Sequence, residues 1–459
     1  MRAVVAWLTV KRWLEPALAL LIVFGIIKCA VFLYQNSYLP PPFFFEPSDT
    51  YADWFNTAFW SRDRGTYDVW KTLYPPLSFV ITRVLGINSC YPDRRSYDFS
   101  AGLAARDCDW VGLGAIWFFF LLNVVLVWMV MRRTDRSTAV PRTICLGLGL
   151  PMIDAVERGN LVLISFTCLL LGLGPLLKSA RLRWLAVGLA VNFKVYLIAA
   201  IAPLVVKRRW RWTEGALISV VLVYLVTFAL LGRGTPLEIF NNIRDFSTLP
   251  AAQITDQWYT TTYQPLLSLI KEGAFPLNLL IGSRNVDLVA FWLPLLQRVV
   301  QASLVAALLA TMLRPEAIPT YRVINFGILL ALISSEAGGY TMMYFMLFTL
   351  METWRGFARR WAIVMCYILA LPLDIIIDKT FPLQRDTYFG DRATMVSYYV
   401  TAGPFVRPLL IMTIALALSL LTIHTILSSF DSRPVGQRWR LPPVLRQALG
   451  ISRPKQPIG

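Results

Sequence analysis

Long runs of apolar residues alternate with polar segments along most of the chain. About twelve of these runs can be read as membrane crossings, at residues 14–33, 111–131, 143–156, 161–177, 185–192, 195–206, 216–231, 288–313, 323–335, 340–351, 361–377 and 408–427. A helix of about 20 residues crosses a hydrocarbon core of roughly 30 Å. The runs are continuous and do not alternate as the strands of a transmembrane β-barrel would. The pattern predicts an all-α polytopic membrane protein with about 12 transmembrane helices.

Basic residues mark one side of the predicted membrane. Arg2, Lys11 and Arg12 precede the first run, and basic clusters at 132–136 and 207–211 follow later ones. Because cytoplasmic loops carry an excess of lysine and arginine, this distribution places the N-terminus in the cytoplasm. No small-residue cleavage site follows the first run, so we interpret it as a retained helix and not as a signal peptide. We expect a multi-pass protein of the plasma (inner) membrane with both termini in the cytoplasm.

Three longer polar segments lie on the opposite side of the membrane in this topology. They are residues 35–110, 232–287 and 378–402, and we call them the first, second and third outer loops. We assign residues 1–430 to one transmembrane domain and residues 431–459 to a basic cytoplasmic tail. The first outer loop is the longest and the richest in acidic and aromatic residues, so it is the first place to look for chemistry.

The composition supports a membrane protein and argues against nucleic-acid binding. The chain is 56% hydrophobic and only 15% charged, whereas soluble proteins carry roughly a quarter charged residues. The net charge is +17, but the surplus lies mainly on the predicted cytoplasmic face. There it suits the anionic lipid of the inner leaflet, so we expect membrane lipids as partners and no nucleic acid.

Three helical limbs are too short for a complete round trip through the membrane. They span residues 143–160, 184–206 and 322–352, and a round trip needs about 40 residues. Broken helices at membrane depth are tolerated where they are buried in protein or line a water-filled cavity. We therefore predict a cavity that opens to the outer side and is floored by the three bends, at residues 157–160, at Lys194 and at residues 336–340.

Two carboxylates four residues apart stand out in the first outer loop. Asp49 and Asp53 follow three phenylalanines and would share one face of a short interfacial helix, capped by Ser48 or Asp49, whose apolar face enters the lipid boundary. A carboxylate that faces a cavity can act as a general base. The alternative is helix capping and solvated charge. Further on, Tyr74 and two prolines open a second interfacial helix at residues 77–87.

Charged residues also occur at the predicted bends. Glu157, Arg158 and Asn160 share one bend, and Lys194 lies at the next. Two cations at the floor of such a cavity suit a phosphate that sits at the membrane interface. The alternative is that Glu157 pairs with Arg158 or Lys194 and only neutralises buried charge. At the third bend, Glu336 and Tyr340 are further candidates for the cavity wall.

The cysteines and the absence of several common motifs limit the kinds of site that the protein could contain. Cys90 and Cys108 lie 18 residues apart in the first outer loop, where an oxidising compartment would allow a disulfide; two free thiols are the alternative. The sequence has no nucleotide-binding loop and no Cys/His cluster, so we expect no cofactor and no metal site. The single histidine, His424, lies near the inner end of the last run, on the wrong side for an outer cavity.

The order of these motifs resembles the GT-C superfamily of glycosyltransferases that use polyprenyl-phosphate sugars. It is most similar to glycosyltransferase family 87, which includes polyprenol-phosphate-mannose mannosyltransferases. The resemblance covers roughly residues 14–430 and rests on the first-loop Asp, Tyr-Pro-Pro-Leu at 74–77, Glu-Arg-Gly-Asn at 157–160 and Asn-Phe-Lys-Val-Tyr at 192–196. The chain departs from the family at two points. No proline follows Tyr196, and the bend at 335–340 lacks a histidine that some members carry.

The resemblance implies a GT-C-type bundle with interfacial helices in the first outer loop. It also implies an inverting transfer of a mannose-like hexose or a pentose from a polyprenyl-phosphate donor to a glycolipid or polysaccharide acceptor on the outer face. Asp49 would be the catalytic base, with Asp53 as second choice, and Arg158 and Lys194 would bind the donor phosphate. The cavity would be lined by Glu157, Asn160, Tyr74, Glu336 and Tyr340.

Two other classes of function remain open. A transporter or flippase for lipid-linked glycans would also have a cationic cavity and broken helices, although transporters usually show an internal repeat. A membrane acyltransferase would usually need a histidine near the membrane on the side of the cavity.

Overall fold

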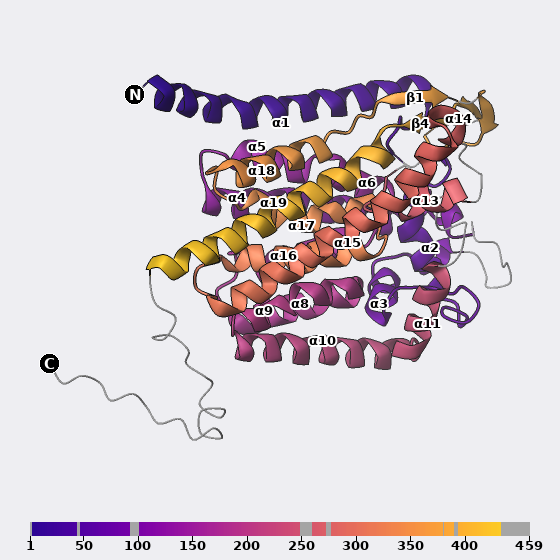
Figure 1. Ribbon diagram of the computed structural model, residues 1–459. Coiled ribbons are helices and arrows are strands. Elements are labelled where there is room, and N and C mark those ends of the chain that lie inside the picture. Colours follow the sequence, from indigo (N-terminus) through magenta and orange to yellow (C-terminus); the bar gives the residue numbers. More distant parts are fainter. Residues whose placement is uncertain are drawn as a thin grey trace.

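The helices of the computed structural model lie side by side in one bundle, with loops and short strands gathered at one end (Figure 1). The structure describes residues 2–43, 46–91, 101–247, 259–271, 277–379, 381–389 and 393–432. Helix α1 (Arg2–Asn36) begins, and helix α19 (Gly403–Ser432) ends, at the end opposite the loops. The predicted tail, from residue 433 onward, lies outside the described residues.

Among the described residues, six helical segments are long and apolar enough to cross a membrane. They are α1, α4 (Trp110–Thr134), the pair α5 (Ala139–Gly147) and α6 (Leu150–Glu157), α10 (Trp210–Leu231), α15 (Ser283–Leu313) and α19. Four shorter apolar segments are α7 (Val162–Leu173), η3 with α9 (Val195–Ala200 and Pro203–Val206), α16 (Thr320–Ser334) and η4 with α17 (Gly339–Thr341 and Met342–Leu350). The prediction of a mostly helical protein is thereby confirmed, and its long apolar helices are consistent with a membrane protein, whereas the prediction of twelve crossings is not confirmed.

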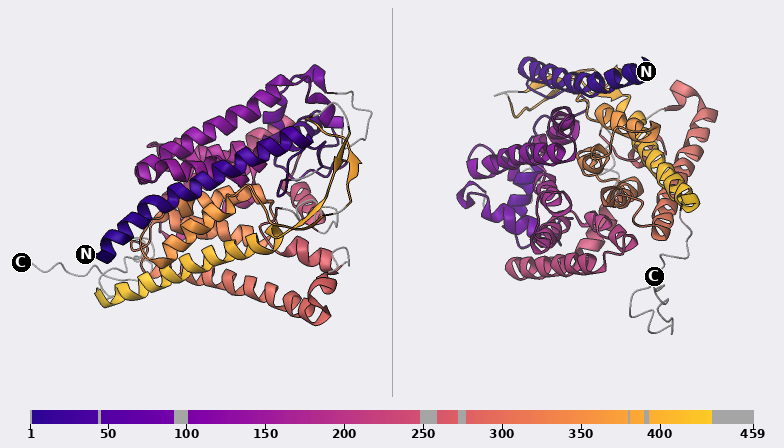
Figure 2. Two further views of the ribbon diagram at one scale, coloured as in Figure 1. Left: turned by 90° about the horizontal axis from the view of Figure 1, so that it is seen from above. Right: turned by 90° about the vertical axis from the view of Figure 1, so that its left-hand side faces the viewer.

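The outer and inner helices of the bundle differ in what their side chains face. Helices α1 and α10 lie at opposite edges of the bundle (Figure 2) and expose large apolar side chains such as Phe24 and Leu225. Exposed apolar surface of this kind suits contact with lipid. Helices α7 and α17 are instead almost wholly buried. The buried ion pairs among the described residues include Arg142 with Glu15 and Arg322 with Glu352. Their mutual neutralisation allows charge at that depth.

The helices break where the sequence predicts short limbs. Gly159, with a φ of 59°, separates α6 from α7, and Lys194 separates α8 (Ala180–Phe193) from η3. Residues 335–338 separate α16 from η4. The first of these limbs has a second break at Gly149, where a side chain would collide with the carbonyl oxygen of Cys145. The predicted breaks are therefore confirmed.

One end of the bundle, which we call the loop end, is formed by the first outer loop, the third outer loop and part of the second outer loop. We use this name for α2 (Ala52–Trp60), α3 (Pro76–Val84), η1 (Asn88–Cys90), η2 (Ala101–Ala105), α11 (Pro236–Ser247), α13 (Gln264–Lys271), α14 (Leu277–Ile281) and the strands, with the turns between them. Strand β1 (Ile376–Lys379) pairs with β4 (Tyr399–Thr401), and β2 (Leu383–Arg385) pairs with β3 (Thr394–Val396), both antiparallel. These short pairs were not predicted, because each strand has only three or four residues.

Two details of the first interfacial helix were predicted wrongly. Helix α2 starts at Ala52, and its N-cap is Tyr51, whose φ of 64° lies in the left-handed region; neither Ser48 nor Asp49 caps it. Its apolar face does not enter lipid, since Trp54 and Phe55 are buried inside the protein. The second helix is α3, which ends at Val84 and is slightly shorter than predicted. A left-handed conformation is costly for a residue with a side chain, so surrounding contacts must hold Tyr51 in place.

Candidate functional site

Asp53 lies in a polar cluster where the first turn of α2 meets the end of α6. Nη2 of Arg158 donates to Oδ1 of Asp53 at 3.0 Å, and the side-chain amide of Asn160 donates to Oδ2 at 2.5 Å. The backbone holds the same contact, because the Asp53 N–H donates to the Arg158 carbonyl at 3.0 Å. Both carboxylate oxygens of Asp53 are therefore engaged, and the carboxylate fixes the orientation of the guanidinium.

Asp49 lies at the rim of the same cluster and is held less tightly. Its Oδ2 is 3.9 Å from Nη1 of Arg158, and its side chain is 33% exposed, against 19% for Asp53. Burial raises the pKa of the Asp49 carboxyl above its usual value, and neighbouring Asp53 adds to this, whereas Arg158 and Arg106 lower it. A carboxylate that is partly open and less acidic than usual suits the acceptance of a proton from a bound hydroxyl.

Glu157 takes part through its backbone and its side chain. Its carbonyl accepts from the N–H of Tyr51 at 2.7 Å, which helps to hold the left-handed residue before α2. One carboxylate oxygen accepts from the hydroxyl of Thr50 at 3.4 Å. The other, Oε2, is buried and has no hydrogen-bond partner among the described residues. Glu157 thus ties α6 to the turn that carries Asp49.

Lys194, at the second predicted bend, lies between the rings of two tyrosines from other segments. Its Nζ is 4.8 Å from the ring centre of Tyr74 and 5.5 Å from that of Tyr340, and the residue is buried. Tyr340 also interacts electrostatically with Arg158. Both predicted cations therefore interact with Tyr340, although the sequence places them in separate limbs.

Glu336 has a different role from the other cavity candidates. Its carboxylate accepts six hydrogen bonds, from the N–H and hydroxyl of both Thr261 and Thr262 and from the N–H groups of Ala337 and Gly338. This arrangement fastens the loop at 261–262 onto the break between α16 and η4. Glu336 thus stabilises the conformation of these two segments.

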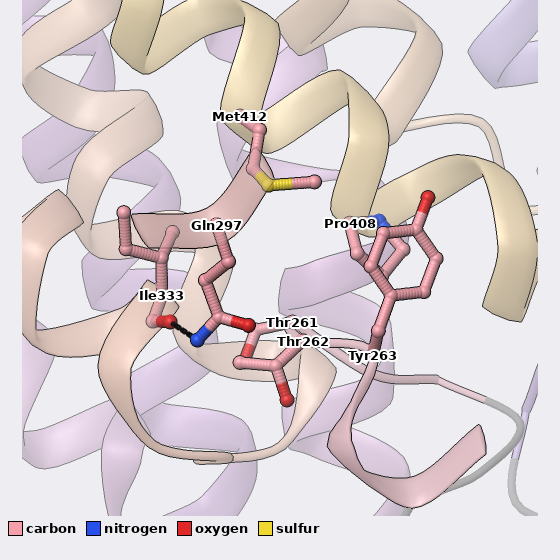
Figure 3. A pocket seen from close by; sticks show the side chains of 7 residues that line it. All are labelled: Thr261, Thr262, Tyr263, Gln297, Ile333, Pro408 and Met412. Carbon is pink, nitrogen blue, oxygen red and sulfur yellow. Dashed lines mark hydrogen bonds between the residues drawn. The ribbon is translucent and has the colours of Figure 1, made fainter. Parts of the chain in front are cut away.

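The same threonines line a small hollow beside this clamp (Figure 3). Its walls come from three elements besides the loop at 261–263: Gln297 on α15, Ile333 on α16, and Pro408 and Met412 on α19. The Gln297 amide is used in a hydrogen bond to the Ile333 carbonyl at 2.5 Å. None of the predicted site residues lines this hollow.

The charge balance of the cluster differs from the prediction. The sequence suggested that Glu157 could offset the charge of Arg158 or of Lys194 but not both, which would leave one cation uncompensated. In the structure Arg158 also has Asp53 and Asp49 as ion-pair partners. An uncompensated charge on Arg158 is therefore no argument for a bound phosphate, and any such role must come from its position beside Asp49 and Tyr340.

Sequence reasoning missed Arg106 and Tyr388, which hold the Asp49 turn from two distant segments. The guanidinium of Arg106 donates to the carbonyls of Ser48 and Thr50, and the N–H of Tyr388 donates to the carbonyl of Pro47 at 3.1 Å. No motif marks these two residues. Cys90 and Cys108, which were predicted to pair, form a disulfide with a Cα–Cα distance of 5.5 Å.

No known protein family, curated protein or solved structure matches this chain. What the site can do follows from its own groups. They are the carboxylate of Asp49, whose side chain is one-third exposed, the guanidinium of Arg158, which Asp53 orients, and the buried Lys194, which contacts Tyr340. Among the described residues, no three Asp, Glu, His or Cys side chains could hold a metal ion together.

Proposed function

We propose that the chain is an inverting glycosyltransferase that moves one sugar from a polyprenyl-phosphate donor to a glycolipid or polysaccharide acceptor. The observation that carries this proposal is the difference between the two aspartates. Asp53 is bound by Arg158 and Asn160 through both oxygens, whereas Asp49 lies 3.9 Å from the same arginine and remains one-third exposed. One carboxylate orients the cation, and the other is open to a substrate.

In this proposal Asp49 takes the proton of the acceptor hydroxyl. The hydroxyl oxygen then attacks the anomeric carbon, the bond from that carbon to the phosphate oxygen breaks, and the phosphate leaves with the electron pair. A single displacement of this kind inverts the anomeric centre. Arg158 and Lys194 would stabilise the negative charge that develops on the leaving phosphate. Cations held in place before the reaction stabilise such charge strongly where water is excluded.

The membrane setting supports a lipid-linked substrate. The cluster lies where α6 meets α2 at the loop end, close to the ends of helices that can cross a membrane. A phosphate attached to a polyprenyl chain is held at the membrane interface by its lipid. We place the loop end on the outer face of the plasma membrane and both termini in the cytoplasm, following the distribution of basic residues.

The proposal is tested with the full-length protein in lipid nanodiscs and a panel of polyprenyl-phosphate sugars. Release of polyprenyl phosphate, with transfer of the sugar to an added glycolipid or oligosaccharide, is the expected result, and parallel reactions with a chelator report metal dependence. The product anomer, read by NMR, should be opposite to that of the donor. In proteoliposomes, movement of intact donor between leaflets without cleavage would instead indicate a flippase and overturn the proposal.

A further inference from the structure

Arg106 contacts the backbone on both sides of Asp49. Its Nη1 donates to the carbonyl of Ser48 at 2.6 Å and to that of Thr50 at 2.7 Å, and its Nε donates to the carbonyl of Leu103 at 3.0 Å. One guanidinium thus joins the segment after η2 to the residues that immediately precede and follow Asp49. The rigid, planar guanidinium fixes such a geometry in a way that a flexible ammonium does not.

The third outer loop closes over the same guanidinium. The Arg106 side chain lies 4.5 Å from the ring centre of Tyr388, and that ring packs edge-on against Tyr51 with 5.7 Å between ring centres. The Tyr388 N–H also donates to the carbonyl of Pro47 at 3.1 Å. The turn that carries Asp49 is therefore held between Arg106 and Tyr388.

The segment that carries Arg106 is itself anchored on one side by a covalent bond. Cys108, two residues after Arg106, is joined to Cys90 in a disulfide. The next residue, Asp109, is buried and accepts hydrogen bonds from the Ile87 and Gly112 N–H groups and from the Tyr91 hydroxyl. The segment that carries Arg106 is therefore joined to the region of η1 both by the disulfide and by the hydrogen bonds of Asp109.

We propose that Arg106 is a positioning residue for Asp49 and that the Cys90–Cys108 disulfide keeps Arg106 in place, so that the site is fully active only in its oxidised form. The role of Asp49 as base rests on the proposed function; the mechanical link from disulfide to Arg106 to Asp49 does not. Reduction by a dithiol transfers two electrons and two protons to the disulfide, giving two thiols while the reagent becomes a disulfide. Cys108 is exposed, so a soluble reagent can reach it.

The charges around Asp49 give this link a measurable signature. The groups that face its carboxyl are Asp53 on α2, Glu157 and Arg158 at the end of α6, and Arg106. Burial raises the pKa of Asp49, and Arg106 is one of the two arginines that lower it. Removal of the Arg106 charge should therefore raise the pKa of Asp49 further, whereas Arg106→Lys keeps the charge and loses only the rigid double contact.

The experiment combines kinetics with infrared titration of the Asp49 carboxyl in nanodiscs. The carboxyl band is assigned by its loss in Asp49→Asn, and it can be followed whether or not turnover is detected. The variants are Arg106→Ala, Arg106→Lys and the double variant Cys90→Ser/Cys108→Ser. The matched control is Arg183→Ala, because Arg183 also donates to a backbone carbonyl and lies over an aromatic ring, but these contacts are with Gly172 and Trp212, away from Asp49 and η1.

We expect Arg106→Ala to lower kcat by on the order of 10²-fold through misplacement of Asp49, and to shift both the carboxyl titration and the acidic limb of the kcat/KM profile to higher pH. Arg106→Lys should lower kcat less and leave both titrations near those of the wild type. The double variant, or wild type treated with a dithiol, should also lose activity, while Arg183→Ala leaves the titration of Asp49 unchanged.

The outcomes separate this inference from the proposed function. If the carboxyl titration shifts in Arg106→Ala but no polyprenyl-phosphate sugar is turned over by the wild type, the link to Arg106 stands and the proposed function fails. If the wild type transfers sugar and Arg106→Ala keeps both the wild-type kcat and the wild-type titration, the positioning role is wrong. Full activity of the reduced protein would overturn the role of the disulfide.

Discussion

Asp53 and Arg158 are joined twice, by the backbone and by their side chains. The N–H of Asp53 donates to the carbonyl of Arg158, and Nη2 of Arg158 donates to Oδ1 of Asp53, both at 3.0 Å. With the bond from the Tyr51 N–H to the Glu157 carbonyl, this fastens the start of α2 to the end of α6. Asp53 and Arg158 lie 105 residues apart in the sequence, so their meeting is a property of the fold and not of a local motif.

From this double contact we predict that Asp53→Asn lowers the stability of the site but leaves the proposed base, Asp49, in place. The backbone bond remains, but the charged hydrogen bond to Arg158 is lost, and bonds of that kind contribute about 1.5–3 kcal/mol. We expect a lower unfolding temperature and a reduced but measurable kcat. A completely inactive Asp53→Asn, with Asp49→Asn near wild type, would assign the base to Asp53.

Arg158 and Lys194 should act on the donor more than on the acceptor. We expect Lys194→Ala to raise the KM for the donor by about tenfold, equivalent to roughly 1.4 kcal/mol, with a smaller effect on the acceptor KM. Arg158→Lys should be milder than Arg158→Ala, because it keeps the charge and loses the geometry. Separate titrations of donor and acceptor measure this, with Arg385→Ala as an exposed control.

A structure with polyprenyl phosphate bound tests the same point directly. The phosphate should lie within salt-bridge distance of Lys194 or Arg158. A phosphate well away from both would leave these residues with structural roles only, Arg158 as the partner of Asp53 and Asp49, and Lys194 over the rings of Tyr74 and Tyr340.

The pH dependence of the reaction should show the environment of Asp49. A base must be deprotonated to act, and burial raises the pKa of this carboxyl. Activity should therefore fall with decreasing pH at a value above about 3.9, the usual value for Asp. A kcat/KM profile measured between acid and neutral pH checks this. An acidic limb at or below the ordinary value would contradict the assignment of Asp49, whose pKa is raised, as the base.

The features that were predicted correctly from the sequence are those that depend on one short segment of the chain. The breaks at Gly159, at Lys194 and before Gly339 follow from limbs that are too short to span the membrane twice, and the pairing of Cys90 with Cys108 follows from two cysteines in one loop. These features depend on length and on local composition, which a sequence shows directly.

Contacts between distant segments could not be read in the same way. Arg106 reaches the turn of Asp49 across 56 and 58 residues, and Tyr388 reaches it from the third outer loop. The left-handed Tyr51 is held by Glu157 from α6, so the N-cap of α2 lies three residues past Ser48 and two past Asp49, the two predicted caps. Each of these outcomes is set by tertiary packing and not by local propensity.

The most direct test of the central claim is the rate of polyprenyl phosphate release by the wild type and by Asp49→Asn, with the donor that the panel identifies. Asn keeps the shape of the side chain at a partly exposed position, so the unfolding temperature and the donor affinity should change little. Loss of a general base should lower kcat by about 10²- to 10⁴-fold. If Asp49→Asn releases polyprenyl phosphate and transfers sugar at nearly the wild-type rate, Asp49 is not the base and the account is wrong.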